Sequence, residues 1–279
     1  MLLSIEGEEK TAKTTTALTA PLPIVAFTFD IGSQRAIYGS KFDTYFKDLK
    51  IETIRYDRIK KDNNVLDMVN PPWINNDITI FELPQPIQLD SKRHEGYIDL
   101  WDYFISRLGL AAGDDRVSSI VIDTATIARR IKTDAYLEEL NVIAVREGKA
   151  IRKQLLQIEY GHANDAMRNI YSLMASINKN FIAIHHLTDE YKPQQASSGA
   201  VESMPTGKRI LEGLTGSARY FDVCIRNDKN NNGLITGKIL TCGYNLSLEG
   251  MPVVPTLDWN SLARLIMGSL DNRIQIDLR

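Results

Sequence analysis

The stretch that decides the fold lies near the N-terminus and reads Gly7-Glu8-Glu9-Lys10-Thr11-Ala12-Lys13-Thr14-Thr15. It matches the phosphate-binding pattern G-x-x-x-x-G-K-[ST] except that Ala12 replaces the second glycine. The apolar run 2–5 can form a strand before the motif, and residues 14–20 can open a helix after it. Such a loop surrounds phosphates with backbone N–H groups at the positive end of a helix. Lys13 would reach the outer phosphates and Thr14 would bind Mg²⁺; the alternative is an ordinary turn before a helix.

The totals describe a globular protein without a strong overall charge. The chain has 279 residues, 43% hydrophobic and 24% charged, with a net charge of −2, which is enough for one large α/β domain or two small ones. Contact with DNA would therefore need a local basic patch or a ring of subunits. Cys224 and Cys242 are too few for a disulfide scaffold, and we expect packed free thiols in a reducing cytoplasm. The alternative is a disulfide between them across a hairpin. No secretory signal and no apolar run of about 18 residues is visible, so we expect no contact with a membrane.

Alternating strand and helix patterns predict an α/β fold with a mostly parallel sheet flanked by helices. The expected strands cover residues 23–29, 51–56, 77–83, 117–124 and 181–184, and the expected helices cover residues 97–108, 124–146 and 163–177, the last of them capped by Asn164 or Asp165.

The C-terminal third is more polar. Residues 187–207 predict a long loop without regular structure, a kind of segment that is usually functional or disordered. Strands at 221–226 and 238–242, joined by an Asn-rich turn, predict a C-terminal β-hairpin, and a short helix follows at 260–267. We expect one domain over residues 1–250, followed by a C-terminal helix and tail over 251–279.

Asp123 ends the apolar run Ser118-Ser119-Ile120-Val121-Ile122. Phosphoryl-transfer sites hold Mg²⁺ with the loop Ser/Thr and an acid at the end of a buried strand. The sequence therefore predicts that Thr14 and Asp123 bind the metal. The alternative is an aspartate that caps the following helix, because Asp is a favoured N-cap residue.

Two adjacent histidines, His185 and His186, end the strand expected at 181–184. Ligands of open α/β sheets bind beyond such strand ends, so a histidine there can contact the γ-phosphate or the attacking water. Neighbouring side chains of an extended chain point to opposite faces, so one of the two can face the nucleotide. The alternative is a partly buried histidine with a satisfied hydrogen bond.

The sequence does not single out one general base, and two carboxylates are candidates for it. Asp30 ends the second expected strand and could orient water, bind Mg²⁺ through water, or only terminate the strand; Glu159 is a weaker candidate. Three cations near the polar segment are candidates for a finger supplied to a neighbouring subunit, or are solvated surface charges. They are Lys208, Arg209 and Arg219.

Glu8 and Lys10 make the loop resemble that of RecA/Rad-type recombinases, which often read G-E-x-R-x-G-K-T. Over residues 2–245 the chain resembles the small RecA-like ATPases of bacteriophages, known as phage nucleotide-binding proteins, some of which act in single-strand annealing with a phage single-stranded-DNA-binding protein. The matching landmarks, in order, are the loop, Asp30-x-Gly32, SSIVIDT, Tyr160-Gly161, Asn164-Asp165 and FIAIHH.

This resemblance implies ATP and Mg²⁺ as ligands, with Lys13, Thr14 and Asp123 in the roles given above, His186 as the polar residue after the sensor strand, and 187–207 as a mobile DNA-facing loop. It also implies a ring or filament of identical subunits in the cytoplasm of a bacterial host. The chain departs from the recombinase pattern at Ala12 and near Gly32, where those proteins carry a catalytic glutamate.

Three functions follow from these observations. The first is an ATPase that acts on single-stranded DNA in phage recombination or replication. The second is a non-catalytic nucleotide-binding module whose occupancy controls assembly or partner binding, which Ala12 and Gly32 favour. The third is a small-molecule kinase; it is disfavoured because such enzymes need an arginine-rich lid and residues 187–207 contain no arginine.

Overall fold

The computed structural model describes residues 1–30, 33–37, 43–58, 70–88, 95–195, 201–214, 216–230, 232–253 and 258–269. Within these residues, the strands of the main sheet are β1 (Leu2–Gly7), β2 (Ile24–Thr28), β3 (Ile51–Arg55), β4 (Ile78–Glu82), β5 (Ser119–Asp123), β6 (Asn180–His185), β9 (Val223–Lys229), β10 (Ile235–Cys242) and β11 (Pro252–Val253). Their order across the sheet is β11-β10-β9-β1-β6-β5-β2-β4-β3. Along this order, the seven strands β9, β1, β6, β5, β2, β4 and β3 run parallel to one another. At the other end of the sheet, β10 is antiparallel to β9 and β11 is antiparallel to β10.

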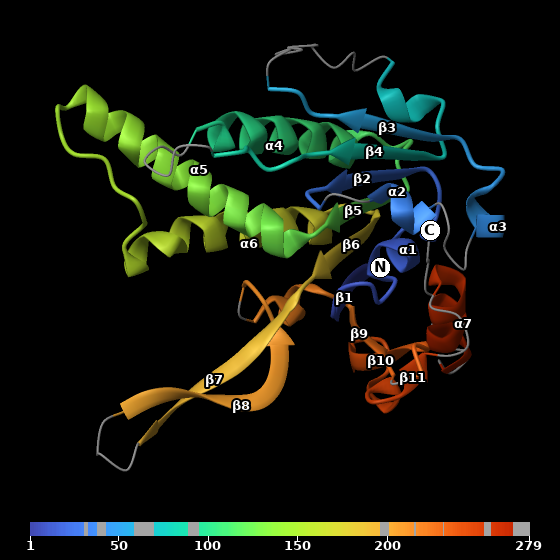
Figure 1. Cartoon of the computed structure of the whole chain (residues 1–279). Coiled ribbons are helices and arrows are strands. Elements are labelled where there is room, and N and C mark those ends of the chain that lie inside the picture. Colours follow the sequence, from blue (N-terminus) through green and yellow to red (C-terminus); the bar gives the residue numbers. More distant parts are fainter. Residues whose placement is uncertain are drawn as a thin grey trace.

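Helices cover both faces of this sheet (Figure 1). They are α1 (Lys13–Ala17), α2 (Ser33–Ile37), α3 (Asp43–Phe46), α4 (Tyr97–Gly113), α5 (Ala125–Arg146), α6 (Gly161–Ser176) and α7 (Trp259–Ser269), with short 3₁₀ turns η1 (Pro72–Ile74), η2 (Gln157–Tyr160), η3 (Ser217–Tyr220) and η4 (Leu246–Leu248). The helices α4, α5 and α6 pack on one face, and α1, α2, α3 and α7 pack on the other. The predicted α/β class, with a mostly parallel sheet flanked by helices, is confirmed.

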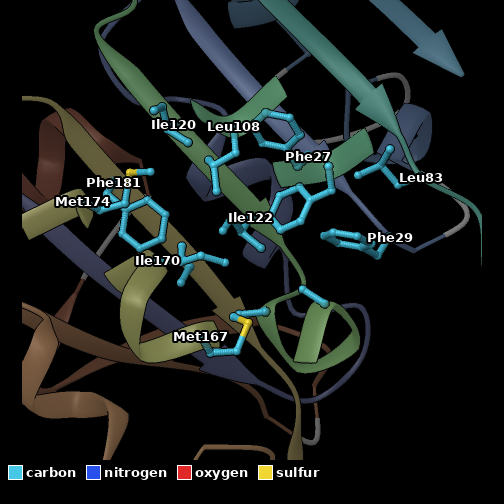
Figure 2. Packing of buried hydrophobic residues seen from close by; sticks show 14 of the residues in the cluster. Phe27, Phe29, Leu83, Leu108, Ile120, Ile122, Met167, Ile170, Met174 and Phe181 are labelled. Carbon is cyan, nitrogen blue, oxygen red and sulfur yellow. The ribbon is translucent and has the colours of Figure 1, made fainter. Parts of the chain in front are cut away.

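The central strands are apolar throughout because both of their faces are covered. Along β2, Val25 and Phe27 join the core under α4 and α5, whereas Ile24 and Ala26 join the core on the other side. The Phe27 ring stacks on Phe81 with centroids 5.4 Å apart. Figure 2 shows this packing continuing along the sheet to α6.

The segment predicted as a long loop is instead an antiparallel hairpin of β7 (Leu187–Gln195) and β8 (Val201–Leu211), called the β7–β8 hairpin below. It projects away from the main sheet (Figure 1). The loop prediction was wrong because the hairpin is largely polar on both sides, so it lacks the period-two apolar alternation that marks a half-buried strand. It is held by its backbone ladder and by local contacts such as Thr206 Oγ1 donating to Glu190 at 2.7 Å.

Other expectations are met more closely. The C-terminal hairpin is present as β9 and β10, and Cys224 and Cys242 are buried free thiols. The helix expected at 163–177 begins two residues earlier, at Gly161, so neither Asn164 nor Asp165 caps it. Instead, the Asn164 side chain accepts a hydrogen bond from Arg129 on α5, at 2.7 Å. None of the helices in the described ranges has the length and apolar character needed to cross a membrane.

Candidate functional site

The loop between β1 and α1 brings Lys13 back onto its own backbone. Its Nζ donates to the carbonyl oxygens of Gly7 at 2.8 Å and Glu8 at 2.5 Å, and the residue is only 7% exposed. Burial lowers the pKa of Lys13, while the negative charges of Asp123 and Asp30 act in the opposite direction. A partly desolvated ammonium group surrounded by carbonyl oxygens is suited to bind an anion of high charge density.

Ala12 adopts a left-handed backbone conformation, with φ 59° and ψ 23°. This conformation explains the glycine in the phosphate-binding pattern, because a Cβ is disfavoured there. The replacement of the second motif glycine by Ala12 therefore places backbone strain in the loop. Lys10 has the same sign of φ, at 59°.

Gly7 is required by a close approach of two backbones. A Cβ on Gly7 would lie 2.3 Å from the carbonyl oxygen of Asn227 on the neighbouring strand β9. The Asn227 side chain is fully buried, and its Nδ2 donates to the Thr11 carbonyl at 3.0 Å. This hydrogen bond attaches the phosphate-binding loop to β9. Sequence reasoning missed Asn227 because no local pattern reveals a partner 216 residues away.

Asp123 and Thr14 meet at the end of β5. The Thr14 hydroxyl donates to Asp123 Oδ2 at 2.7 Å. Burial raises the pKa of Asp123 to about 6, and the Thr14 hydrogen bond partly opposes this rise. The N-cap alternative for Asp123 is wrong, since Thr124 occupies the cap and its hydroxyl accepts from Ile127 N at 3.3 Å. A hydroxyl and a carboxylate side by side are oxygen ligands of the kind that Mg²⁺ takes.

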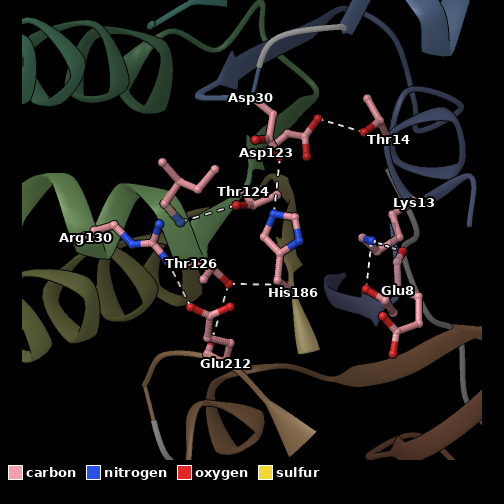
Figure 3. A network of polar contacts seen from close by, with 12 residues as sticks. Glu8, Lys13, Thr14, Asp30, Asp123, Thr124, Thr126, Arg130, His186 and Glu212 are labelled. Carbon is pink, nitrogen blue, oxygen red and sulfur yellow. Dashed lines mark hydrogen bonds and ion pairs between the residues drawn. The ribbon is translucent and has the colours of Figure 1, made fainter. Parts of the chain in front are cut away.

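The side chains of the two adjacent histidines point to opposite faces, as expected for neighbouring residues of an extended chain. His185 is 2% exposed, packs against Phe221, and has a pKa lowered by burial to about 3, so it stays neutral. His186 turns the other way, and its Nε2 lies 3.2 Å from Asp30 Oδ2. Because β6 lies between β1 and β5, His186 emerges between the loop and Asp123 (Figure 3).

Hydrogen bonds tie His186 to the start of α5. Its backbone N–H donates to Thr126 Oγ1 at 3.1 Å, and that hydroxyl donates to the Glu212 carbonyl at 3.2 Å. Glu212 N donates back to the His186 carbonyl at 2.9 Å, and the Glu212 carboxylate pairs with Arg130 at 3.1 Å. Figure 3 shows this chain of contacts running from Asp30 to the end of the β7–β8 hairpin.

The remaining candidates lie in different surroundings. Arg209 contacts Glu8 of its own chain, with Nη1 3.3 Å from Oε1. Lys208 is exposed beside it on β8, and the Arg219 guanidinium lies 5.0 Å from the centroid of the Tyr220 ring.

The weaker general-base candidate, Glu159, is held by contacts within its own segment. Its carboxylate accepts from both Arg152 Nη1, at 2.8 Å, and Leu156 N, at 2.7 Å, which makes it a structural carboxylate in η2. Gly32 lies outside the described residues.

Within the described residues, no group of three or more His, Cys, Asp and Glu side chains could hold a metal ion by itself. Thr14 and Asp123 provide two oxygen ligands, and Mg²⁺ usually completes its coordination with waters and substrate phosphates. The residues present therefore fit a Mg²⁺ ion that arrives with a nucleotide, and do not fit a metal held by protein side chains alone.

The family of this chain follows from comparison with known proteins. A comparison with curated proteins finds no match. Among solved structures, the chain is similar to the crystal structure of the RadB recombinase, with 12% sequence identity, a TM-score of 0.41, and coverage of 90% of this chain and 84% of that chain. A family profile described as AAA domain matches residues 2–214, which contain the loop, Asp123 and His186. Because that match spans well over half of its length, the chain belongs to the AAA_24 family of AAA domains, a class of nucleotide-binding domain.

Proposed function

We propose that this protein binds MgATP in the loop of residues 7–15 and hydrolyses it. The observation that carries the proposal is the hydrogen bond from Thr14 to Asp123, at 2.7 Å, next to the buried ammonium group of Lys13. Lys13 would neutralise the outer phosphates. Mg²⁺ bound by Thr14 and Asp123 would supply charge neutralisation at the phosphate oxygens, which is most of what phosphoryl transfer asks of a protein.

Asp30 and His186 are our candidates for handling the attacking water. They lie 3.2 Å apart at the ends of two strands of the sheet, β2 and β6, that flank the strand bearing Asp123. In this role the Asp30 carboxylate accepts a proton from water, and the His186 ring fixes its orientation through the hydrogen bond between them. Asp30 would then replace the glutamate that the sequence lacks near Gly32.

Phosphate release from ATP tests the activity. We expect turnover in the presence of Mg²⁺ that Lys13→Ala abolishes and that the exposed, distant Lys153→Ala leaves intact. Asp30→Asn should lower kcat by a factor of about 10² to 10⁴, the usual contribution of a general base, with little change in MgATP affinity. Equal turnover by wild type and Lys13→Ala would exclude hydrolysis at this loop.

A non-catalytic nucleotide module is the second candidate, and the left-handed Ala12 favours it. A strained loop can bind phosphate and still hold it poorly for in-line attack. Under this alternative, ATP binding drives assembly or partner binding. Saturable MgATP binding without phosphate release, even in the presence of DNA, would establish the module and rule out the ATPase.

We also propose that the protein acts on single-stranded DNA, as a RecA-like ATPase of bacteriophage recombination or replication in the cytoplasm of a bacterial host. The support is the projecting β7–β8 hairpin, which carries Tyr191, 58% exposed, and the exposed cation Lys208. Exposed aromatic rings and cations are what single strands bind by stacking and ion pairing. ATP-dependent retention of single-stranded DNA that weakens steeply as salt is raised would support this role; no retention at low salt would exclude it.

A ring or filament of identical subunits, with a phage single-stranded-DNA-binding protein as a further partner, completes the proposal. Lys208 and Arg219 are the candidates for a finger that reaches a neighbour's phosphates, whereas Arg209 contacts Glu8 of its own chain. Mixing Lys13→Ala with Arg219→Ala subunits tests this arrangement. A shared site predicts recovery of ATPase activity in the mixture, because some interfaces then combine an intact loop with an intact arginine; two variants that stay inactive together would exclude Arg219 as that finger.

A further inference from the structure

The base of the β7–β8 hairpin lies between two parts of the candidate phosphate site. On one side, Glu212 at its exit is bound to Thr126 and Arg130 in the first turns of α5, directly after Asp123. On the other side, Arg209 reaches the loop between β1 and α1, where it contacts Glu8. The hairpin is therefore attached to both the phosphate-binding loop and the helix that follows the metal-binding strand.

Arg209 is positioned for this contact by its own hairpin. Its Nη2 donates to the Leu187 carbonyl at 3.0 Å, and its Nε lies 3.4 Å from the carboxylate of Asp189, the residue opposite it in the ladder. These contacts point the planar guanidinium toward Glu8, with Nη1 3.3 Å and Nη2 3.4 Å from the two carboxylate oxygens. A two-point contact of this kind is specific to arginine, since lysine offers a single charge.

Glu8 is also one of the two residues whose backbone carbonyls bind Lys13, together with Gly7. The Glu8 carbonyl accepts from Lys13 Nζ at 2.5 Å and from Thr11 Oγ1 at 2.8 Å, while the Glu8 carboxylate accepts from Arg209. One loop residue therefore joins the cation that would bind phosphate to the cation that anchors the hairpin.

We propose that Arg209 is a positioning residue for its own chain's phosphate loop, and that the Glu8–Arg209 ion pair couples nucleotide binding to the order of the β7–β8 hairpin. This proposal rests on nucleotide binding at the loop, as put forward above. A carboxylate beside a polyphosphate site repels the ligand unless it is neutralised, and Arg209 neutralises it. By linkage, a pair that favours nucleotide binding is itself favoured by bound nucleotide.

A double-mutant cycle measured by calorimetric titration of MgATP tests the coupling. We expect Arg209→Gln to raise Kd about two- to fivefold, the range of an ion pair that is partly exposed. Glu8→Gln should not raise Kd, and the double variant should return to the value of Glu8→Gln. The matched control is Lys192→Gln, which removes a hairpin cation that pairs with Glu190 instead, at 3.5 Å, and we expect its Kd to be unchanged.

The cycle separates the outcomes clearly. An equal loss of affinity when Arg209 is removed with or without Glu8 would overturn the proposal, because the arginine would then act independently of the pair. No loss in Arg209→Gln would overturn it as well. Absence of MgATP binding in the wild type would instead refute nucleotide binding itself, so the two failures are distinguishable.

A second measurement reports on the hairpin rather than on affinity. Chymotrypsin cleavage after the exposed Tyr191 should slow when MgATP is added to the wild type, since the bound loop holds Arg209 and with it the base of the hairpin. In Glu8→Gln/Arg209→Gln, saturating MgATP should leave the cleavage rate unchanged. Equal slowing in both proteins would show that the hairpin responds to nucleotide without this ion pair, and would overturn the coupling.

Discussion

At Ala12, a residue with a Cβ occupies a conformation that glycine adopts freely. Replacing it with glycine should raise the free energy of unfolding by about 1 kcal/mol, because the left-handed strain outweighs the extra chain entropy of glycine. MgATP affinity should be preserved or improved. Urea unfolding and calorimetric titration measure the two quantities.

Ala144→Gly is the matched control, since Ala144 lies in regular helix within α5. There the same substitution should lower stability by about 1 kcal/mol. A loss of stability or of affinity in Ala12→Gly would mean that the loop does not have the conformation described.

Asp123 gives a pH dependence whose sign follows from its burial. Its pKa is raised from 3.8 to about 6, so the folded state favours the protonated form. This contribution to stability is fully present below about pH 4 and is lost as the pH rises through 6. We expect Asp123→Asn to be more stable than wild type by about 2 to 3 kcal/mol at pH 7.5 without Mg²⁺, and equal to it below about pH 4.

Thermal unfolding across pH measures this difference, and the exposed Asp165→Asn should show no comparable trend. Added MgATP should stabilise the wild type more than Asp123→Asn, because the amide is a poorer ligand for Mg²⁺ than a carboxylate. A wild type that stays as stable as Asp123→Asn above pH 7 would contradict the buried carboxylate.

Residues within one motif could be predicted from the sequence, and residues that act across the fold could not. Asp123 directly ends an apolar strand pattern, and Lys13 and Thr14 belong to the motif that follows another one. Asn227 and the Glu8–Arg209 contact join residues more than 200 positions apart, at 216 and 201. Only the strand order, with β9 beside β1 and β7 directly after β6, brings them together.

Among the elements, α4 begins in a way that its own sequence does not explain. Its N-terminal N–H groups, from Gly96, Tyr97 and Ile98, donate to the carboxylate of Glu138 on α5 at 2.8, 2.8 and 2.9 Å. One side chain therefore satisfies three backbone donors and places a negative charge at the positive end of the helix.

Glu138→Ala should lower the free energy of unfolding by about 2 kcal/mol, because it removes both the hydrogen bonds and the charge. The neighbouring Glu139→Ala is the control. Glu139 pairs with Lys132 at 3.1 Å and is 41% exposed, so its loss should cost less than about 1 kcal/mol. Chemical denaturation distinguishes the two variants, and equal costs would show that the cap does not stabilise α4.

The β7–β8 hairpin can be shortened without disturbing its base. Asp189 and Arg209 face each other in the ladder, so replacing residues 190–208 with Asn-Gly leaves a tight two-residue turn between them. We expect global stability and MgATP affinity close to wild type, and loss of single-stranded-DNA retention. Filter retention at low salt measures the effect, and DNA binding that survives the deletion would place the DNA contact elsewhere.

For the elements, as for the residues, local patterns could be predicted from the sequence and pairing between segments could not. The strands β2, β5 and β6 could be predicted because burial on both faces makes them continuous apolar runs. The hairpin could not, because its strands contact solvent on both sides and are specified by pairing with each other. Its polar sequence indicated a segment outside the core but not the regular structure of that segment.

For the molecule as a whole, the alternation of strands and helices predicted the fold class, and the apolar faces of the sheet explain the two helical layers. What the pattern could not supply is the strand order. That order inserts β6 between the loop strand β1 and the acid strand β5, and so gathers Lys13, Asp123 and His186 at one edge.

The position of β1, β5 and β6 in the middle of a sheet covered on both faces also sets how the molecule opens. Their amide protons should exchange with solvent deuterium only through global unfolding, whereas those of the β7–β8 hairpin should exchange through local fluctuations. The free energy of opening at the candidate site would then equal the free energy of global unfolding, while the β7–β8 hairpin would open independently at a lower free energy. A ligand bound at the ends of these three strands would slow exchange throughout the central sheet, far from any atom it contacts.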